Sequence, residues 1–190
     1  MKYLLLSASL IGQPIHLDNP AAIQAPHMGT PVDAISHCGS VLLGLSGKPD
    51  SGLDKLYLKA SISKDTEFMT YLLAVIYVES HFNKQAVSEQ EARGLMQMTS
   101  IAVDSATQHC KFKSITSDHL FDSYTNIKYG SCYLKKMLDE SNGDWTKALI
   151  LYNGGYRQLT KYMQGDDITT ETANYILKVN RARELCLQTN

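Results

Sequence analysis

The pattern of apolar and polar positions changes near residue 52. After that point the chain has no proline, and apolar residues recur at helical spacing, which predicts a domain made mostly of α-helices. The most apolar stretch covers residues 68–78, where hardly a polar side chain interrupts the run. A helix that is apolar on all sides belongs in the centre of a domain. This stretch is therefore the predicted central helix.

Capping residues mark where further helices begin. Ser, Thr and Asp favour the position before a helix because their side-chain oxygens accept hydrogen bonds from free backbone N–H groups. The helices that we expect cover residues 53–60, 68–78, from Thr99 or Ser100 to 109, from Asp122 or Ser123 to 138, 145–152, 156–163 and 170–187. Strand signals and internal repeats are nearly absent, so the expected fold class is mostly α.

Residues 1–52 differ from the rest in composition. All 5 prolines of the chain lie there, interleaved with glycines, and both residue types interrupt long helices. Only residues 32–45 could hold a short apolar helix. We therefore expect an irregular N-terminal extension over 1–52, used for docking or placement, and a domain over 53–190 that folds and acts alone.

Length and composition are ordinary for a soluble globular domain. The chain has 190 residues, 44% hydrophobic and 19% charged, with a formal charge of −1. That charge gives no electrostatic reason to expect nucleic acid or an anionic membrane as a partner. No stretch reaches the roughly 18 to 20 apolar residues that span a bilayer, so we expect no transmembrane segment.

The first twelve residues weakly resemble a signal peptide. Lys2 precedes a short apolar run, but no good cleavage site follows it. Two interpretations stay open: the segment is cleaved on export, or it remains and packs on the domain or on a partner.

The chain has 4 cysteines: Cys38, Cys110, Cys132 and Cys186. An even number fits two disulfides in an oxidising compartment, but four cysteines allow three pairings, and buried free thiols are an equal alternative. No two cysteines have CxxC spacing. We therefore expect neither a zinc site nor any other metal or cofactor.

Glu79 is the residue that points most clearly to chemistry. It follows the apolar run directly, so its carboxylate should be partly desolvated, and the negative end of the helix dipole should lie close to it. Both effects raise the pKa of a carboxyl group. A carboxylic acid that is still protonated near neutral pH can act as a general acid in glycoside cleavage. The alternative is an ordinary glutamate that turns out to water.

Five short blocks between residues 74 and 175 carry a resemblance to a known family. They are residues 74–83 with Glu79-Ser80, residues 94–98 (Gly-Leu-Met-Gln-Met), residues 120–134 with Asp122, Asn126 and Gly130, residues 148–155 with Tyr152-Asn153, and Glu171-Thr172 with Tyr175. Together they resemble the lytic transglycosylase domain of the soluble, Slt-like kind, within the lysozyme-like superfamily. Two positions depart from the family pattern: Glu91 stands in a usual glycine place, and Gly154 replaces the usual alanine.

The resemblance implies cleavage of the β-1,4 bond between N-acetylmuramic acid and N-acetylglucosamine in peptidoglycan glycan strands. The muramoyl 6-hydroxyl attacks C1, so the product carries a 1,6-anhydro end and no water is consumed. Glu79 would be the sole acid and base, where glycosidases ordinarily use two carboxylates. The 2-acetamido oxygen of the substrate would stand in for the second group.

Further site residues follow from the same blocks. Ser80 would hold Glu79 or the acetamido group, although a hydroxyl at a helix end is the plainer interpretation. Met96 and Gln97 would line the sugar subsites, and core filling is the alternative for Met96. By resemblance, Tyr152 would hydrogen-bond Glu79 or the acetamido group, Asn153 would shape the cleft, and Glu171 and Tyr175 would form its far wall.

Two other functions remain open. A true lysozyme would use water as the nucleophile and a second carboxylate, for which Asp104, Asp118 and Asp122 are available. A binding or structural component of a virion or secretion machine would grip peptidoglycan without cutting it, with residues 1–52 as the attachment. In each case the protein acts at the bacterial cell wall or periplasm, either exported or carried by a virion, and the sequence leaves bacterial or phage origin undecided.

Overall fold

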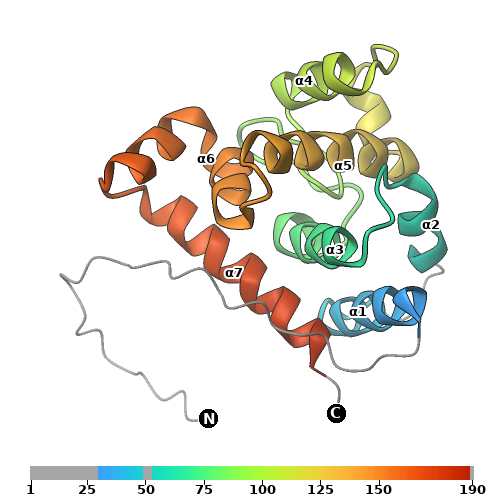
Figure 1. The fold of residues 1–190 in the computed structure, drawn as a ribbon. Helices are drawn as coiled ribbons and strands as arrows, with labels where there is room; N and C mark the ends of the chain where they lie inside the picture. The colour runs from blue at the N-terminus through green and yellow to red at the C-terminus, as the bar shows by residue number, and fades with distance from the viewer. Residues whose placement is uncertain (1–29, 49–52, 189–190) are drawn as a thin grey trace, which may run out of the picture.

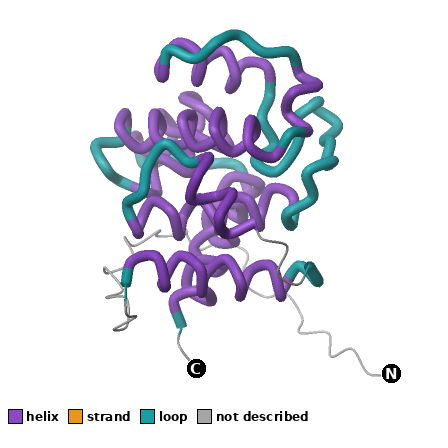
Figure 2. The backbone as a smooth tube through the Cα atoms, turned by 90° about the vertical axis from the view of Figure 1, so that its right-hand side faces the viewer, coloured by secondary structure: helices purple, strands orange, loops and turns teal. Residues whose placement is uncertain are grey.

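The computed structural model describes residues 30–48 and 53–188, and over these residues the fold is entirely helical apart from two isolated β-bridges. This confirms the predicted fold class (Figures 1 and 2). The described elements are α1 Pro31–Leu45, α2 Leu53–Ala60, α3 Thr66–Ser80, α4 Ser100–Cys110, the 3-10 helix η1 Ser117–Phe121, α5 Ser123–Glu140, α6 Trp145–Gln164 and α7 Thr170–Leu187.

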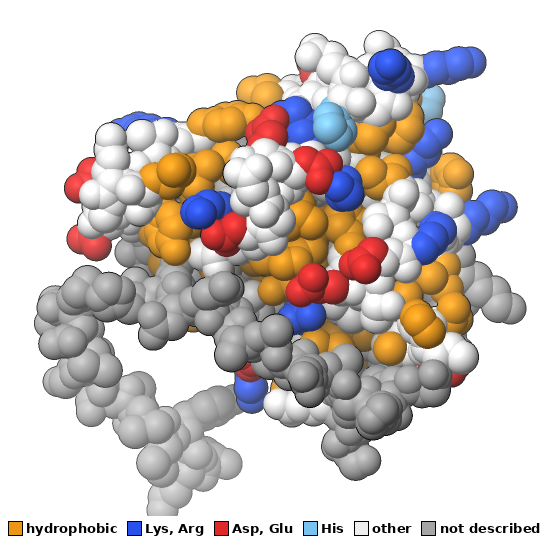
Figure 3. All heavy atoms as spheres, viewed as in Figure 1, with side chains coloured by type: hydrophobic (Ala, Val, Ile, Leu, Met, Phe, Trp, Pro, Cys, Tyr) orange, Lys and Arg blue, Asp and Glu red, His pale blue; other side chains and the backbone are white. Residues whose placement is uncertain are grey.

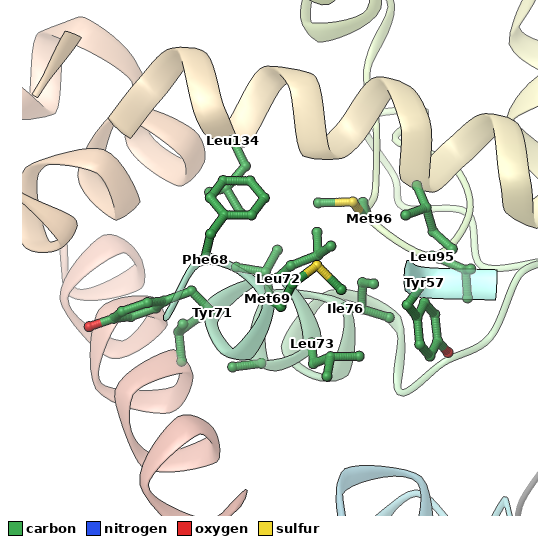
Figure 4. Packing of buried hydrophobic residues seen from close by; sticks show 14 of the residues in the cluster. Tyr57, Phe68, Met69, Tyr71, Leu72, Leu73, Ile76, Leu95, Met96 and Leu134 are labelled. Carbon is green, nitrogen blue, oxygen red and sulfur yellow. The ribbon is translucent and has the colours of Figure 1, made fainter. Parts of the chain in front are cut away.

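Helix α3 is the centre of the core. The Asp65 side chain caps its start by accepting a hydrogen bond from the backbone N–H of Phe68 at 2.8 Å. Every residue from Phe68 to Ile76 is buried, and α1 and α7 pack against this helix. Leu134 of α5 lies over Phe68 (Figure 4). An apolar run without a polar face thus forms the buried helix that it predicts.

Helix α1 forms where residues 32–45 were expected to allow a short apolar helix within an otherwise irregular extension. Thr30 and Asp33 form a reciprocal capping box, and Pro31 is the first helical residue. A proline in that place costs no hydrogen bond, because the first backbone N–H groups of a helix have no partner within it. Pro31 therefore begins the helix, whereas the sequence analysis took it as a helix breaker.

The same helix shares the core with residues after 53. Ile35, Leu42 and Leu43 are almost fully buried in one cluster with α3 and α7 side chains. The division of the chain at residue 52, with a domain over residues 53–190 that folds and acts alone, stays a prediction. The possible signal peptide lies outside the described residues.

Both disulfides connect helices. Cys38 of α1 is bonded to Cys186 of α7, and Cys110 of α4 is bonded to Cys132 of α5. The first bond joins residues 148 positions apart and the second joins residues 22 apart. By the loop-entropy relation they disfavour the unfolded chain by about 5 and about 3 kcal/mol.

The surface carries no single-sign charge patch on the face that Figure 3 shows. Acidic and basic side chains are interspersed there with apolar ones. None of the helices in the described ranges combines the length and the apolar character that crossing a bilayer requires.

Candidate active site

Glu79 lies in the last turn of α3 and is half-buried. Desolvation by burial raises the pKa of its carboxyl group from 4.5 to about 7. The helix ends at once: His81 has a left-handed backbone (φ 48°), and so does Phe82 (φ 57°). These two residues end the helix, so the apolar helix closes with an acid that is half protonated near neutral pH.

Two tyrosines from other helices face this carboxyl group. Tyr175 of α7 is buried, and its hydroxyl has no partner within hydrogen-bond distance. It is still close enough to favour the carboxylate, and this contact lowers the pKa of Glu79 against the larger effect of burial. Burial first, and then the charge of Glu79, raise the pKa values of Tyr152 and Tyr175 well above the ordinary tyrosine value. Both phenols therefore stay neutral.

The segment of residues 94–98 is fixed by hydrogen bonds from two helices and by one within the segment itself. The Ser80 hydroxyl donates to the Leu95 carbonyl oxygen at 2.8 Å, and the Tyr152 hydroxyl donates to the Met96 carbonyl oxygen at 2.8 Å. Gln97 has a left-handed backbone (φ 46°), and its side-chain amide donates to the Gly94 carbonyl oxygen at 2.9 Å. The segment is thereby held to α3 and α6, the helices of Glu79 and Tyr152.

Asn126 lies in one of the five blocks, but the sequence predicted no role for it. It is fully buried at the start of α5; its Oδ1 accepts from the Met96 N–H at 2.8 Å, and its Nδ2 donates to the carbonyl oxygens of Arg93 and Leu120 at 2.9 and 2.8 Å. Gly94 permits this approach, because a Cβ there would lie 2.2 Å from the Asn126 amide nitrogen. An asparagine on the apolar face of a predicted helix was the available signal, since buried amides need partners.

Three of the predicted substrate-binding side chains are engaged elsewhere. The Ser80 and Tyr152 hydroxyls bond to the carbonyls of residues 95 and 96 and not to Glu79. The Met96 side chain is fully buried, with its sulfur over Gly130, so it fills the core, and its role in a sugar subsite stays a prediction. The small residue at 130 is the physical reason, because it leaves room for the thioether.

The remaining predicted residues have fewer contacts. Asn153 is half-buried next to Tyr152, and Gln97 is half-buried. Glu171 is exposed in the first turn of α7. It precedes Tyr175 by one helical turn, so the two lie on one side of α7.

No acidic side chain in the described ranges shifts the pKa of Glu79. Asp118 pairs with Arg93 at 3.1 Å, Asp122 caps α5, and Asp104 is exposed. The candidates for a second carboxylate are therefore used elsewhere or turned to solvent. Within the described ranges, no three or more His, Cys, Asp or Glu side chains lie together so that they could hold a metal ion.

Glu91, which replaces a usual glycine, has a left-handed backbone (φ 61°) and is exposed. Its carboxylate reaches Arg93 at 3.3 Å. A non-glycine residue pays about 1 to 2 kcal/mol for that backbone conformation. Glu91 therefore adopts, at a cost in free energy, the left-handed backbone conformation that a glycine would adopt freely.

The family model described as "Transglycosylase SLT domain" matches residues 57–175. That is more than half of the chain. The chain belongs to this family of lytic transglycosylases. The predicted resemblance is confirmed. The match begins within α2 and ends at Tyr175, so α1, with Cys38, and the rest of α7, with Cys186, lie outside it.

Two relatives illustrate the likeness. The chain is 28% identical over 145 residues to "Membrane-bound lytic murein transglycosylase C" of Photorhabdus laumondii, covering 60% of this chain and 41% of the relative. Among solved structures it resembles the 70 kDa soluble lytic transglycosylase Slt70 of Escherichia coli, with a TM-score of 0.62, 19% identity, and 70% of this chain and 24% of that one covered. The SLT transglycosylase domain therefore has this fold here, while the chain spans less than half of either relative.

Proposed function

We propose that this protein is a peptidoglycan lytic transglycosylase in which Glu79 is the only acid/base. The observation that carries the proposal is the half-buried Glu79 carboxyl group, whose pKa is about 7, inside the matched domain. One side chain that first donates and then accepts a proton needs a pKa near the operating pH. Family membership supports peptidoglycan glycan strands as the substrate.

The proposed reaction runs in two steps. Protonated Glu79 donates its proton to the oxygen between the sugars, the bond from that oxygen to C1 of N-acetylmuramic acid breaks, and N-acetylglucosamine leaves. The acetamido oxygen of the substrate stabilises the positive charge at C1. The Glu79 carboxylate then takes the proton of the muramoyl 6-hydroxyl as its oxygen bonds to C1. Glu79 ends protonated, and the product carries a 1,6-anhydro ring.

Tyr175 fits the second half of this cycle. Its neutral hydroxyl is buried, unpartnered and close to Glu79, so it is free to stabilise the carboxylate that forms once the proton has left. A hydrogen bond to a carboxylate in a desolvated site is stronger than one between neutral groups. We therefore propose that Tyr175 offsets the effect of burial on the pKa of Glu79, because burial alone would keep the carboxyl group protonated.

The two alternatives have less support. A hydrolytic lysozyme would use a second carboxylate to activate water, and no acidic side chain in the described part of the chain acts on the pKa of Glu79. A binding or structural protein that does not cut glycan has no need for a carboxyl group held near pKa 7. The comparisons give no support to an association with a virion or a secretion machine.

The place of action is proposed to be the cell wall, outside the cytoplasm. Two disulfides, Cys38–Cys186 and Cys110–Cys132, join helices of the fold. Such bonds persist in oxidising compartments. The peptidoglycan substrate lies there too. A role of residues 1–52 in docking or placement stays a prediction.

Exchanging Glu79 for glutamine tests the proposal. The amide has nearly the same size but cannot donate the proton, and losing a general acid lowers the rate by about 10² to 10⁴. Clearing of purified sacculi by Glu79→Gln is measured against Glu184→Gln, which makes the same chemical change in the last turn of α7. Wild-type clearing by Glu79→Gln would refute Glu79 as the acid/base.

A further inference from the structure

Helix α6 is broken one turn after Tyr152, and the break shapes its junction with α7. Gly155 has φ 69° and ψ −176°, a backbone conformation that essentially only glycine adopts. Gln158 lies beyond the break, and the chain then reverses at Gly165 into the loop before α7. The two halves of α6 therefore have separate tasks: the first carries Tyr152, and the second meets the start of α7.

Gly154 allows the start of α7 to pack closely against α6. A Cβ at this position would lie 2.6 Å from Cγ of Gln158 and 2.7 Å from the hydroxyl oxygen of Thr172. Thr172 is buried in the first turn of α7. The alanine that the family pattern has here would need the space that Gln158 and Thr172 occupy. Gly154 thus fits a tight contact between α6 and the start of α7.

Gln158 holds the residue that caps α7. Its Oε1 accepts a hydrogen bond from the Thr169 backbone N–H at 2.9 Å. Thr169 is the N-cap: its hydroxyl accepts from the Thr172 N–H at 3.3 Å and donates to the Thr172 hydroxyl at 3.0 Å. Tyr175 follows Thr172 by almost one helical turn. A chain of contacts therefore runs from Gln158 to the turn that presents Tyr175.

The Tyr175 hydroxyl interacts with the Glu79 carboxyl group but has no partner at hydrogen-bond distance among the described residues. Its distance from Glu79 therefore depends on where α7 is placed. We propose that Gly154 and Gln158 are positioning residues of the active site, which fix the start of α7 and thereby hold Tyr175 against Glu79. This inference rests on the proposed function, and it assigns a role to two residues that the reaction itself does not use.

If α7 is displaced, the pKa of Glu79 should change. The titratable groups that interact with its carboxyl group are Tyr152 from α6 and Tyr175 from α7. Tyr175 lowers the pKa of Glu79, so moving it away should raise that pKa further. A loss of overall stability alone would leave the pKa of the folded protein unchanged, which separates positioning from a general structural effect.

The test compares Gln158→Leu, which removes the acceptor, with Gln158→Glu, which keeps it. Gln164→Leu makes the same chemical change at an exposed position at the end of α6 and is the matched control. We expect Gln158→Leu to raise the pKa of Glu79, followed by NMR of its side-chain carboxyl carbon, and to lower kcat by about threefold to tenfold. Gln158→Glu and Gln164→Leu should stay within about twofold of the wild-type rate, the normal spread for substitutions without such a role.

Gly154→Ala restores the family residue and should nevertheless cost more, about tenfold to a hundredfold in kcat. An unchanged Glu79 pKa in folded Gln158→Leu would overturn the inference, and this variant decides the matter if Gly154→Ala does not fold. A wild-type protein that cuts no glycan would refute the proposed function alone, because the NMR titration needs no substrate.

Discussion

Helices α1 and α7 meet around Cys38 and Cys186 through apolar side chains and a disulfide bond. Around Glu79, by contrast, helices α3, α6 and α7 present polar groups to one another. Ile35, Leu42 and both cysteines are almost fully buried in the first region. In the second, burial holds the pKa of Glu79 at about 7, and the Tyr175 hydroxyl has no partner.

The difference is one of energy. The first region gains stability from every contact, whereas the second keeps a desolvated acid and an unsatisfied hydroxyl, each of which costs free energy. Groups held at such a cost are typical of functional sites. Substitutions in the first region should therefore lower stability without changing the chemistry, and substitutions in the second should lower activity without lowering stability.

The largest expected effect is on stability, in the first region. Replacing Cys38 and Cys186 with alanine should lower the free energy of unfolding by about 5 kcal/mol, because the bond closes the longer loop. Removing Cys110 and Cys132 should cost less, about 3 kcal/mol. Denaturant unfolding measures both. Glycan cleavage per folded molecule should stay unchanged in the Cys38/Cys186 variant, and a specific loss of activity would show that this region also shapes the site.

The second effect is a gain of stability in the inactive Glu79→Gln protein. The folded pKa of Glu79 is about 7, against 4.5 for the free side chain. Because this pKa is raised, the wild type should lose about 3 kcal/mol as the pH rises from about 4 to about 8. The amide does not titrate. The difference in unfolding free energy between the variant and the wild type should therefore grow across that pH range, and a constant difference would mean that Glu79 is not desolvated.

The smallest of these effects is that of Tyr175→Phe. Removing the hydroxyl should lower kcat by about tenfold, less than the roughly 10²- to 10³-fold lost with an oxyanion-hole donor, because Tyr175 acts on Glu79 and not on the substrate. Stability should not fall, because a buried hydroxyl without a hydrogen-bond partner among the described residues costs free energy in the folded protein, and phenylalanine removes it. Without it the pKa of Glu79 rises, so the fall of kcat/KM at alkaline pH should move to higher pH. An unmoved pH profile would contradict the contact between Tyr175 and Glu79.

The sequence predicted the parts of this molecule that depend on local pattern. The run from Phe68 to Val78 has no polar face, so burial of α3 follows, and so does a desolvated carboxyl group directly after it. Pro31 was misinterpreted because proline both breaks helices and begins them, and only the capping contact of Thr30 with Asp33 decides between the two.

Contacts between distant segments could not be predicted in the same way. The disulfide pairing depends on α1 lying against α7, and burial of Met96 depends on the space over Gly130. The Tyr152 hydroxyl donates to the Met96 carbonyl oxygen because Asn126 holds the segment of residues 94–98 in place. Each of these outcomes is set by a helix that is remote in sequence.

The most direct measurement is the mass of the products released from purified sacculi by the wild-type protein. Attack by the muramoyl 6-hydroxyl leaves 1,6-anhydro ends, which are lighter than reducing ends by one water. We predict anhydro ends, released by the wild type and by Glu184→Gln but not by Glu79→Gln. Products with only reducing muramoyl ends would contradict the single-carboxylate mechanism and would mean that water is the nucleophile.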